Sequence, residues 1–271
     1  MNAQTSVILN SLKRSPLLVG DVLSADVFER NLLGDPDEGM ALDYEQKLGH
    51  LYEDALERLI DSAPSLDRIA SNLQIFDENR RTIGELDFVV RDKQSGHYIH
   101  LELAVKFYLA IKRDDGWKCP GPNARDNWQA KLDRMRDHQF QLTRRAEARA
   151  LLKDKFGITD ITVQHLIYGC LFLPIGCDEW PAPDAISGNA RIGRWLYVSQ
   201  WDDYLSHIHD AFIIPKPLWP VEISDDVRPL LTPVTVEELK QAAQERCTMF
   251  TIAGSHDVWF LAPDDWAREE S

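Results

Sequence analysis

Three strand-like runs follow one another without an intervening helix, and this order limits the folds that the chain can adopt. The runs cover about residues 70–77, 82–91 and 97–109. Between the last two lie residues 92–96, Asp-Lys-Gln-Ser-Gly, a composition typical of a hairpin turn. We therefore expect the second and third runs to pair as an antiparallel hairpin.

Helical patterns flank these runs. Residues 5–33 read as one or two helices interrupted near Pro16. Apolar residues at three- and four-residue spacing predict a helix over about 42–60 with one buried face. A long helical stretch is expected over 125–156, and a buried strand over 163–173. This order of helix, three strands, helix and strand predicts an α/β fold in which helices flank a mixed sheet.

The chain divides into three parts on this pattern. Residues 1–40 are expected to form N-terminal helices and residues 41–175 a core. Residues 176–271 are expected to form an α+β extension packed on that core, because aromatic-rich strands alternate there with a helix near 236–246. A chain of 271 residues is long enough to bury a sizeable core.

Charge and apolar content exclude some classes of function. The chain has 44 acidic and 30 basic residues and a net charge of −14, which is atypical of a general nucleic-acid coat. No apolar run reaches the roughly 18 residues of a membrane span, and the N-terminus lacks the pattern of a secretory signal. The four cysteines form no CxxC pair, so we expect reduced thiols and a cytoplasmic protein.

Acidic residues interrupt the two apolar strands of the predicted hairpin. Asp87 lies in the segment IGELDFVV and Glu102 in HLELAVK. Because side chains alternate along a strand, pairing of the two strands can bring these carboxylates together on one face. Close carboxylates raise each other's pKa unless a cation lies between them, and oxygen ligands of this kind suit Mg²⁺. The alternative is a solvated face or an ion pair.

The pattern resembles the PD-(D/E)XK nuclease superfamily, whose members carry an Asp on one strand and (D/E)xK on the next. That restriction-endonuclease-like core has the element order predicted above, and its first helix commonly carries a Glu after a Gly, as Gly49 and Glu53 do here. The resemblance implies a nuclease that uses Mg²⁺ or Mn²⁺. It implies metal ligation by Glu53, Asp87 and Glu102, and catalysis by Asp87, Glu102 and Lys106.

The sequence departs from the superfamily motif at one position. Ala104 occupies the place of the motif Lys, two residues after Glu102. Lys106 lies on the same strand face but roughly 6–7 Å further along. Its flexible side chain could reach back, or it could simply neutralise the acids. A non-catalytic relative that keeps the fold as a binding or scaffold protein is therefore the alternative interpretation.

Four segments are similar to a narrower bacterial family, the one called domain of unknown function 1853. The similarity covers about residues 40–175 well and the rest more loosely, and it implies no particular activity. The segments are LGHLYE, GELDF, HLELAVKFYL and GPNARDNWQAKLDRMRDHQFQL.

A basic segment follows the acidic strands. Residues 106–155 contain 13 basic and seven acidic residues, a net charge of +6, so the remainder of the chain carries −20. Such a segment beside a metal site could steer a DNA or RNA backbone, although a solvated helix face with internal ion pairs gives the same composition. The helical Gln at 139 also resembles one used by the RecB-like branch of the superfamily. The candidate nucleic-acid contacts are Arg125, Lys131, Arg134, Gln139 and Arg145.

Overall fold

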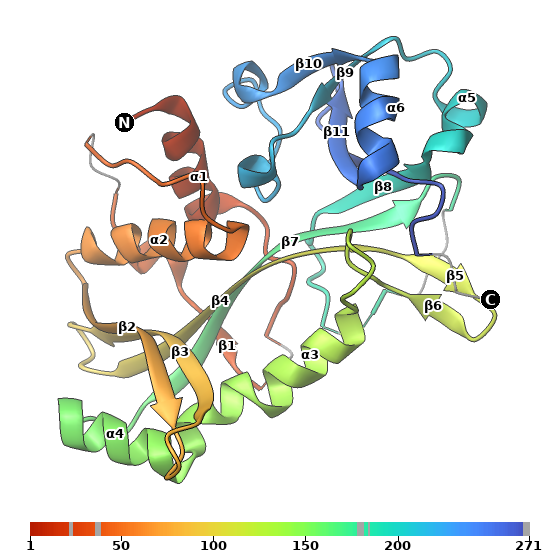
Figure 1. Ribbon diagram of the computed structural model, residues 1–271. Coiled ribbons are helices and arrows are strands. Elements are labelled where there is room, and N and C mark those ends of the chain that lie inside the picture. The colour runs from red at the N-terminus through yellow and green to blue at the C-terminus, as the bar shows by residue number, and fades with distance from the viewer. Residues whose placement is uncertain (22–23, 36–38, 178–181, 184, 268–271) are drawn as a thin grey trace.

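A computed structural model describes residues 1–21, 24–35, 39–177, 182–183 and 185–267 of the chain. Its described helices and strands are arranged around one large mixed sheet (Figure 1). The α-helices are α1 (Ala3–Arg14), α2 (Leu48–Asp61), α3 (Trp128–Asp137), α4 (Ala146–Phe156), α5 (Trp201–Tyr204) and α6 (Val236–Glu245). The strands are β1 (Asp26–Val27), β2 (Leu66–Phe76), β3 (Thr82–Asp92), β4 (Tyr98–Leu109), β5 (Ile111–Arg113), β6 (Gly116–Lys118), β7 (Thr162–Pro174), β8 (Ile192–Tyr197), β9 (Asp210–Ile213), β10 (Thr232–Thr235), β11 (Thr248–Ile252) and β12 (Trp259–Ala262).

The sheet has ten strands in the order β10-β9-β11-β12-β8-β7-β4-β3-β2, with β1 beside β7. Strands β2, β3 and β4 are antiparallel, whereas β4 pairs in parallel with β7 along its length. Strand β8 pairs in parallel with both β7 and β12, so the C-terminal strands continue the sheet of the core. The predicted mixed α/β architecture is confirmed, and so is the hairpin turn, where the Gly96 amide donates to the Asp92 carbonyl at 2.8 Å.

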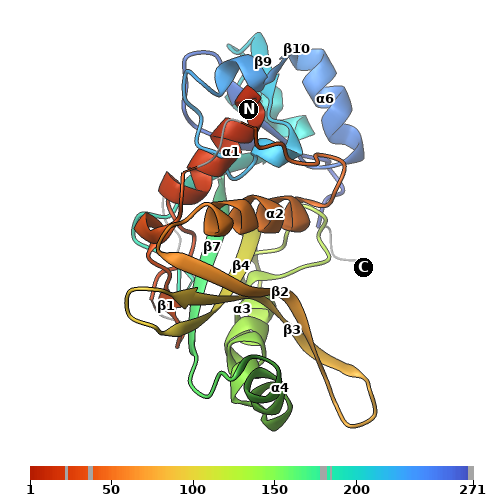
Figure 2. The ribbon, with the colours of Figure 1, turned by 90° about the vertical axis from the view of Figure 1, so that its left-hand side faces the viewer.

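Helices cover both faces of the sheet. Helices α1 and α2 pack on one face through a large apolar cluster, and α3 and α4 lie on the opposite face (Figure 1). The rotated view places α2 between the β2–β3 hairpin and the C-terminal group of β9, β10 and α6 (Figure 2). The start of α2 and the middle of β4 therefore face the junction between the core and the C-terminal region.

The N-terminal prediction was partly wrong. Helix α1 ends at Arg14, and within residues 15–33 the described part contains a short 3₁₀ turn and β1 instead of a second α-helix. The β1 pair aligns Asp26 with Gln164 of β7, and the Phe28 amide donates to the His165 carbonyl at 3.1 Å. A strand edge distant in sequence thus supplies the hydrogen bonds that a helix would have supplied internally. The second predicted helix also begins later than expected, at Leu48.

Residues 125–156 do not form one long helix. Helix α3 ends at Asp137, and a 3₁₀ segment, Gln139–Arg144, leads into α4. The break lets Leu142 pack against Gly84 of β3, where a Cβ atom would lie 2.6 Å from the leucine side chain. A straight helix could not deliver this side chain to the sheet. The same 3₁₀ segment places Gln139 under β4.

Candidate active site

Strands β3 and β4 separate at the position that carries the predicted acids. Their pairing runs from Arg91 and Tyr98 to Phe88 and Leu101 and then stops. Asp87 and Glu102 occupy the next opposed position. The amide of Leu103 donates instead to Oδ2 of Asp87 at 2.9 Å. The Asp87 side chain thus takes the place of a backbone acceptor in the β3–β4 ladder. The Leu103 amide holds its carboxylate where the two strands stop pairing.

The Glu102 carboxylate is held from two sides. Glu102 is 2% exposed, and its Oε1 lies 2.7 Å from Nε2 of the fully buried His100. Its Oε2 accepts a hydrogen bond of 3.2 Å from the Gln139 side chain. Because His100, Glu102 and Lys106 alternate along β4, all three belong to the strand face that meets the 3₁₀ segment. Each carboxylate oxygen retains further lone pairs for a ligand.

Burial and like charge raise the pKa of both carboxyl groups. Burial is the main cause of the raised pKa of Asp87, which lies well above its ordinary value, and the charge of Glu102 adds to it. Burial raises the pKa of Glu102 to about 8, with Glu53 and Glu85 contributing in the same direction. Within the described residues, no Lys or Arg makes an ion pair with Asp87 or Glu102. The acidic pair therefore has no protein counter-ion there.

Two buried histidines border the acidic pair. His165 lies beside Glu102 in the β4–β7 register and stacks on Phe140 with ring centroids 5.6 Å apart. Burial lowers the pKa of both His100 and His165 to about 4. Both imidazoles are accordingly neutral near pH 7, and neither supplies a positive charge to Glu102.

Lys106 is partly buried and makes no ion pair with any described carboxylate. Burial is the main cause of its lowered pKa, and the charge of Lys131 adds to the effect. The charges of Asp126, Asp87 and Glu53 oppose it. Lys106 therefore lies within electrostatic range of the acids, although Ala104 stands between it and Glu102 on the strand face.

Glu53 approaches the pair from α2. Its side chain is 21% exposed, and its Oε2 lies 3.1 Å from Nδ1 of His50. Its charge raises the pKa of Asp87 and Glu102. The described part of the chain nevertheless contains no group of three or more His, Cys, Asp or Glu side chains arranged to hold a metal ion. Ligation by Glu53 therefore stays a prediction, and Asp87 and Glu102 are the donors that lie closest in register.

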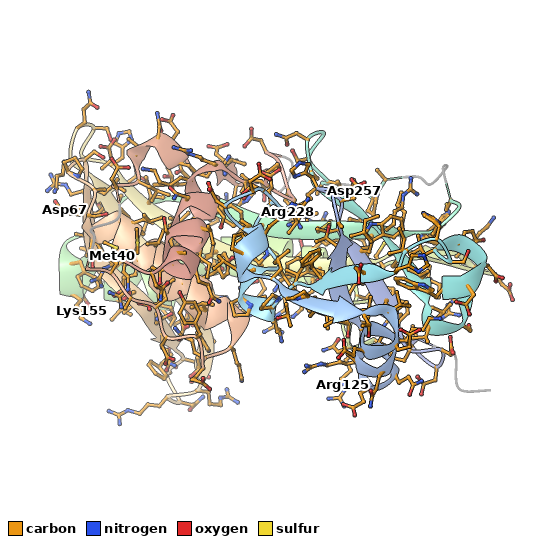
Figure 3. The ribbon with its side chains drawn as sticks, turned by 90° about the horizontal axis from the view of Figure 1, so that it is seen from above. Met40, Asp67, Arg125, Lys155, Arg228 and Asp257 are labelled. Atoms are coloured by element: carbon orange, nitrogen blue, oxygen red, sulfur yellow. The ribbon has the colours of Figure 1, made fainter. Side chains whose placement is uncertain are left out.

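The predicted basic segment is divided in the structure. Lys131 lies 4.0 Å from Asp126, whereas Arg134 and Arg145 are exposed. Seen from above, Arg125 and Lys155 lie well apart, toward opposite ends of the molecule (Figure 3). The part of the basic segment from Arg125 to Lys155 therefore has its two ends far apart. Gln139, one of the five predicted nucleic-acid contacts, donates a hydrogen bond to Glu102, and its contact with a nucleic acid stays a prediction.

Sequence reasoning overlooked two contributors to this site. His100 was not among the candidates, although it precedes Glu102 by two residues and so had to share its strand face. The amide of Leu103 carries no sequence signal, because its role depends on where β3 leaves β4.

The fold and site define a class: a mixed α/β protein with a largely buried acidic pair at the opening between two strands. The chain belongs to the family described as domain of unknown function (DUF1853), whose model matches residues 23–253. This confirms the family similarity inferred from the four sequence segments. Neither a curated protein nor a solved structure matches the chain. None of the described helices is long and apolar enough to cross a membrane.

Proposed function

We propose that this protein is a Mg²⁺-dependent nuclease of the PD-(D/E)XK type, which hydrolyses phosphodiester bonds. The observation that carries the proposal is the opposed pair Asp87 and Glu102, held by the Leu103 amide and the His100 ring and lacking a described counter-ion. Apart from the small β5–β6 hairpin after β4, the order α2-β2-β3-β4-α3-α4-β7, with β7 parallel to β4, resembles the superfamily core and supports this interpretation.

The donor chemistry of the pair fits a hard divalent cation. Mg²⁺ usually binds proteins through one or two carboxylates and keeps several waters, so two acids suffice. Asp87 and Glu102 offer a cation only oxygen atoms as ligands. Of the neighbouring histidines, His100 is hydrogen-bonded to Glu102 and His165 lies beside it on β7. When bound, Mg²⁺ would polarise the phosphate and lower the pKa of an attacking water.

The side chains around the pair have separate roles in this proposal. Leu103 and Gln139 hold the two carboxylates in position through hydrogen bonds. Lys106, partly desolvated and without an ion pair, would orient the phosphate or the attacking water by donating a hydrogen bond. Glu53 would add negative charge and increase the affinity for a cation.

Cleavage assays on single- and double-stranded DNA and RNA test the proposal. We expect cleavage that requires Mg²⁺ or Mn²⁺, that Glu102→Gln abolishes, and that Glu78→Gln leaves unchanged. Glu78 is a matched control because it is exposed in the turn between β2 and β3, away from the site. Wild-type protein that cleaves none of these substrates with either metal would contradict the proposal.

The position of Lys106 favours the non-catalytic alternative. Ala104 occupies the position at which the superfamily motif has Lys, so Lys106 must act from further along β4. A protein that binds Mg²⁺ at Asp87 and Glu102 yet cleaves nothing would be the binding or scaffold relative.

A further inference from the structure

A cavity of about 620 Å³ lies between the core and the C-terminal region. Its walls come from the start of α2, one edge of β4, the loop within residues 121–126, and residues within 213–219 and 246–249. The volume falls in the range of about 300–1,000 Å³ that is typical of small-molecule sites. Lys106 belongs both to this cavity and to the candidate active site, so the two adjoin.

Positive charge converges on the cavity. Asp126 is the one acidic residue among its described lining residues, and it already lies 4.0 Å from Lys131. The basic lining residues make no ion pair with a described carboxylate. In a chain of net charge −14, four cations around one cavity suit an anionic ligand, although only Lys106 is half-buried and the other three are exposed. These cations are Lys47, Lys106, Lys216 and Arg246.

The edge of β4 adds neutral hydrogen-bonding groups to the cavity. On this edge Leu103 donates its amide to Asp87, and Leu109 donates to the Pro120 carbonyl at 2.9 Å. By alternation, the amides of Val105 and Phe107 point to the same edge, which β3 no longer covers. Tyr108, which is 1% exposed, also lines the cavity.

An aromatic wall stands beside these polar groups. Trp219 is half-buried and lines the cavity, with its ring centroid 5.3 Å from that of Phe107. The Nζ of Lys216 lies 5.9 Å from the Trp219 centroid. Ile213 and Met249 complete an apolar surface. An aromatic and apolar wall beside several cations suits a nucleotide, whose base stacks on an aromatic ring and whose phosphate binds cations.

We propose that this cavity binds one nucleoside monophosphate unit, with its phosphate among the cations and its base against Trp219. The proposal rests on the proposed nuclease function, because Lys106 would place this unit next to Asp87 and Glu102 as part of a nucleic-acid substrate. The C-terminal region then supplies binding residues for the substrate, Lys216 and Arg246 among them.

Calorimetric titration of the Glu102→Gln protein without divalent cations tests binding separately from cleavage. The probes are AMP, adenosine, inorganic phosphate, a 5′-phosphorylated octanucleotide and an acidic peptide. Lys216→Gln and Arg246→Gln are added singly on this background. Lys155→Gln is the matched control, because Lys155 also lies over an aromatic ring, that of Phe156 at 5.0 Å.

We expect AMP to bind more tightly than adenosine or phosphate, and the octanucleotide to bind at least as tightly as AMP. Lys216→Gln and Arg246→Gln should each weaken AMP binding about tenfold, and Lys155→Gln should have no effect.

No AMP binding, equal binding of phosphate, or tighter binding of the peptide would overturn the nucleotide site. Binding of AMP without the octanucleotide would overturn its role for nucleic acid. Nuclease activity without AMP binding would refute this site alone, and AMP binding without activity would refute the proposed function alone.

Discussion

Asp87 accepts a hydrogen bond from the amide of Leu103 across the point at which β3 and β4 part. The strands can separate there because the carboxylate replaces the carbonyl that would otherwise pair with this amide. Separation leaves a gap in the sheet, and Asp87 and Glu102 face each other across it. The position of the acidic pair and the end of the β3–β4 pairing therefore have a common origin.

The pH dependence of stability reports the raised pKa of Glu102. In the folded protein this pKa is about 8, against an ordinary value of 4.5, so the folded state retains a proton that the unfolded chain releases. Without metal, the free energy of unfolding should therefore fall as pH rises through this window. His100 and His165 act oppositely, but only below about pH 6.5, because their pKa falls from 6.5 to about 4 on folding.

Between about pH 6.5 and 8 Glu102 should contribute a slope of at most about 1.4 kcal/mol per pH unit, the limit for one proton. Urea unfolding at several pH values measures this slope. Glu102→Gln should reduce it and Glu78→Gln should not. A slope that is the same in wild type and Glu102→Gln would show that Glu102 does not titrate in this range.

Gln139→Ala tests whether Gln139 positions Glu102. Loss of the 3.2 Å hydrogen bond should cost about 1 kcal/mol of stability and weaken Mn²⁺ binding roughly 10- to 100-fold. The matched control is Gln141→Ala, because the Gln141 side chain makes hydrogen bonds with Arg136 and Arg144 and not with Glu102. Equal metal affinity in the two variants would exclude a positioning role for Gln139.

Lys106→Ala separates metal binding from chemistry. Lys106 is expected to contact the phosphate or the water, so its loss should slow cleavage by about 10²-fold or more while Mn²⁺ still binds. Adding Ala104→Lys, which restores the motif spacing on the same strand face, should recover part of the rate. Full activity of Lys106→Ala would exclude the proposed role.

The exposed arginines of the basic segment test nucleic-acid contact. Arg134→Glu with Arg145→Glu should weaken binding to DNA or RNA and reduce its log–log salt slope by about two, one for each lost phosphate contact. Fluorescence anisotropy at several salt concentrations measures both quantities. An unchanged slope would leave these residues outside the interface.

The acids could be predicted from sequence because their placement follows from local rules. Strand alternation and the hairpin turn at residues 92–96 together fix which residue opposes Asp87. The break after α3 could not be predicted, because it depends on packing between Leu142 and Gly84, 58 residues earlier in the chain. The cavity could not be predicted either, because it is lined both by β4 and by residues more than 100 positions later in the chain. Non-local contacts of this kind leave no periodic signal in a single sequence.

Binding of Mn²⁺, measured by electron paramagnetic resonance at about pH 8, tests most directly whether Asp87 and Glu102 form a shared cation site. We expect about one ion per chain in the wild type, and an affinity at least about tenfold weaker in Asp87→Asn and Glu102→Gln. Glu78→Gln should bind as the wild type does. A wild-type chain that binds no Mn²⁺, or a Glu102→Gln chain that binds it equally well, would contradict the shared site.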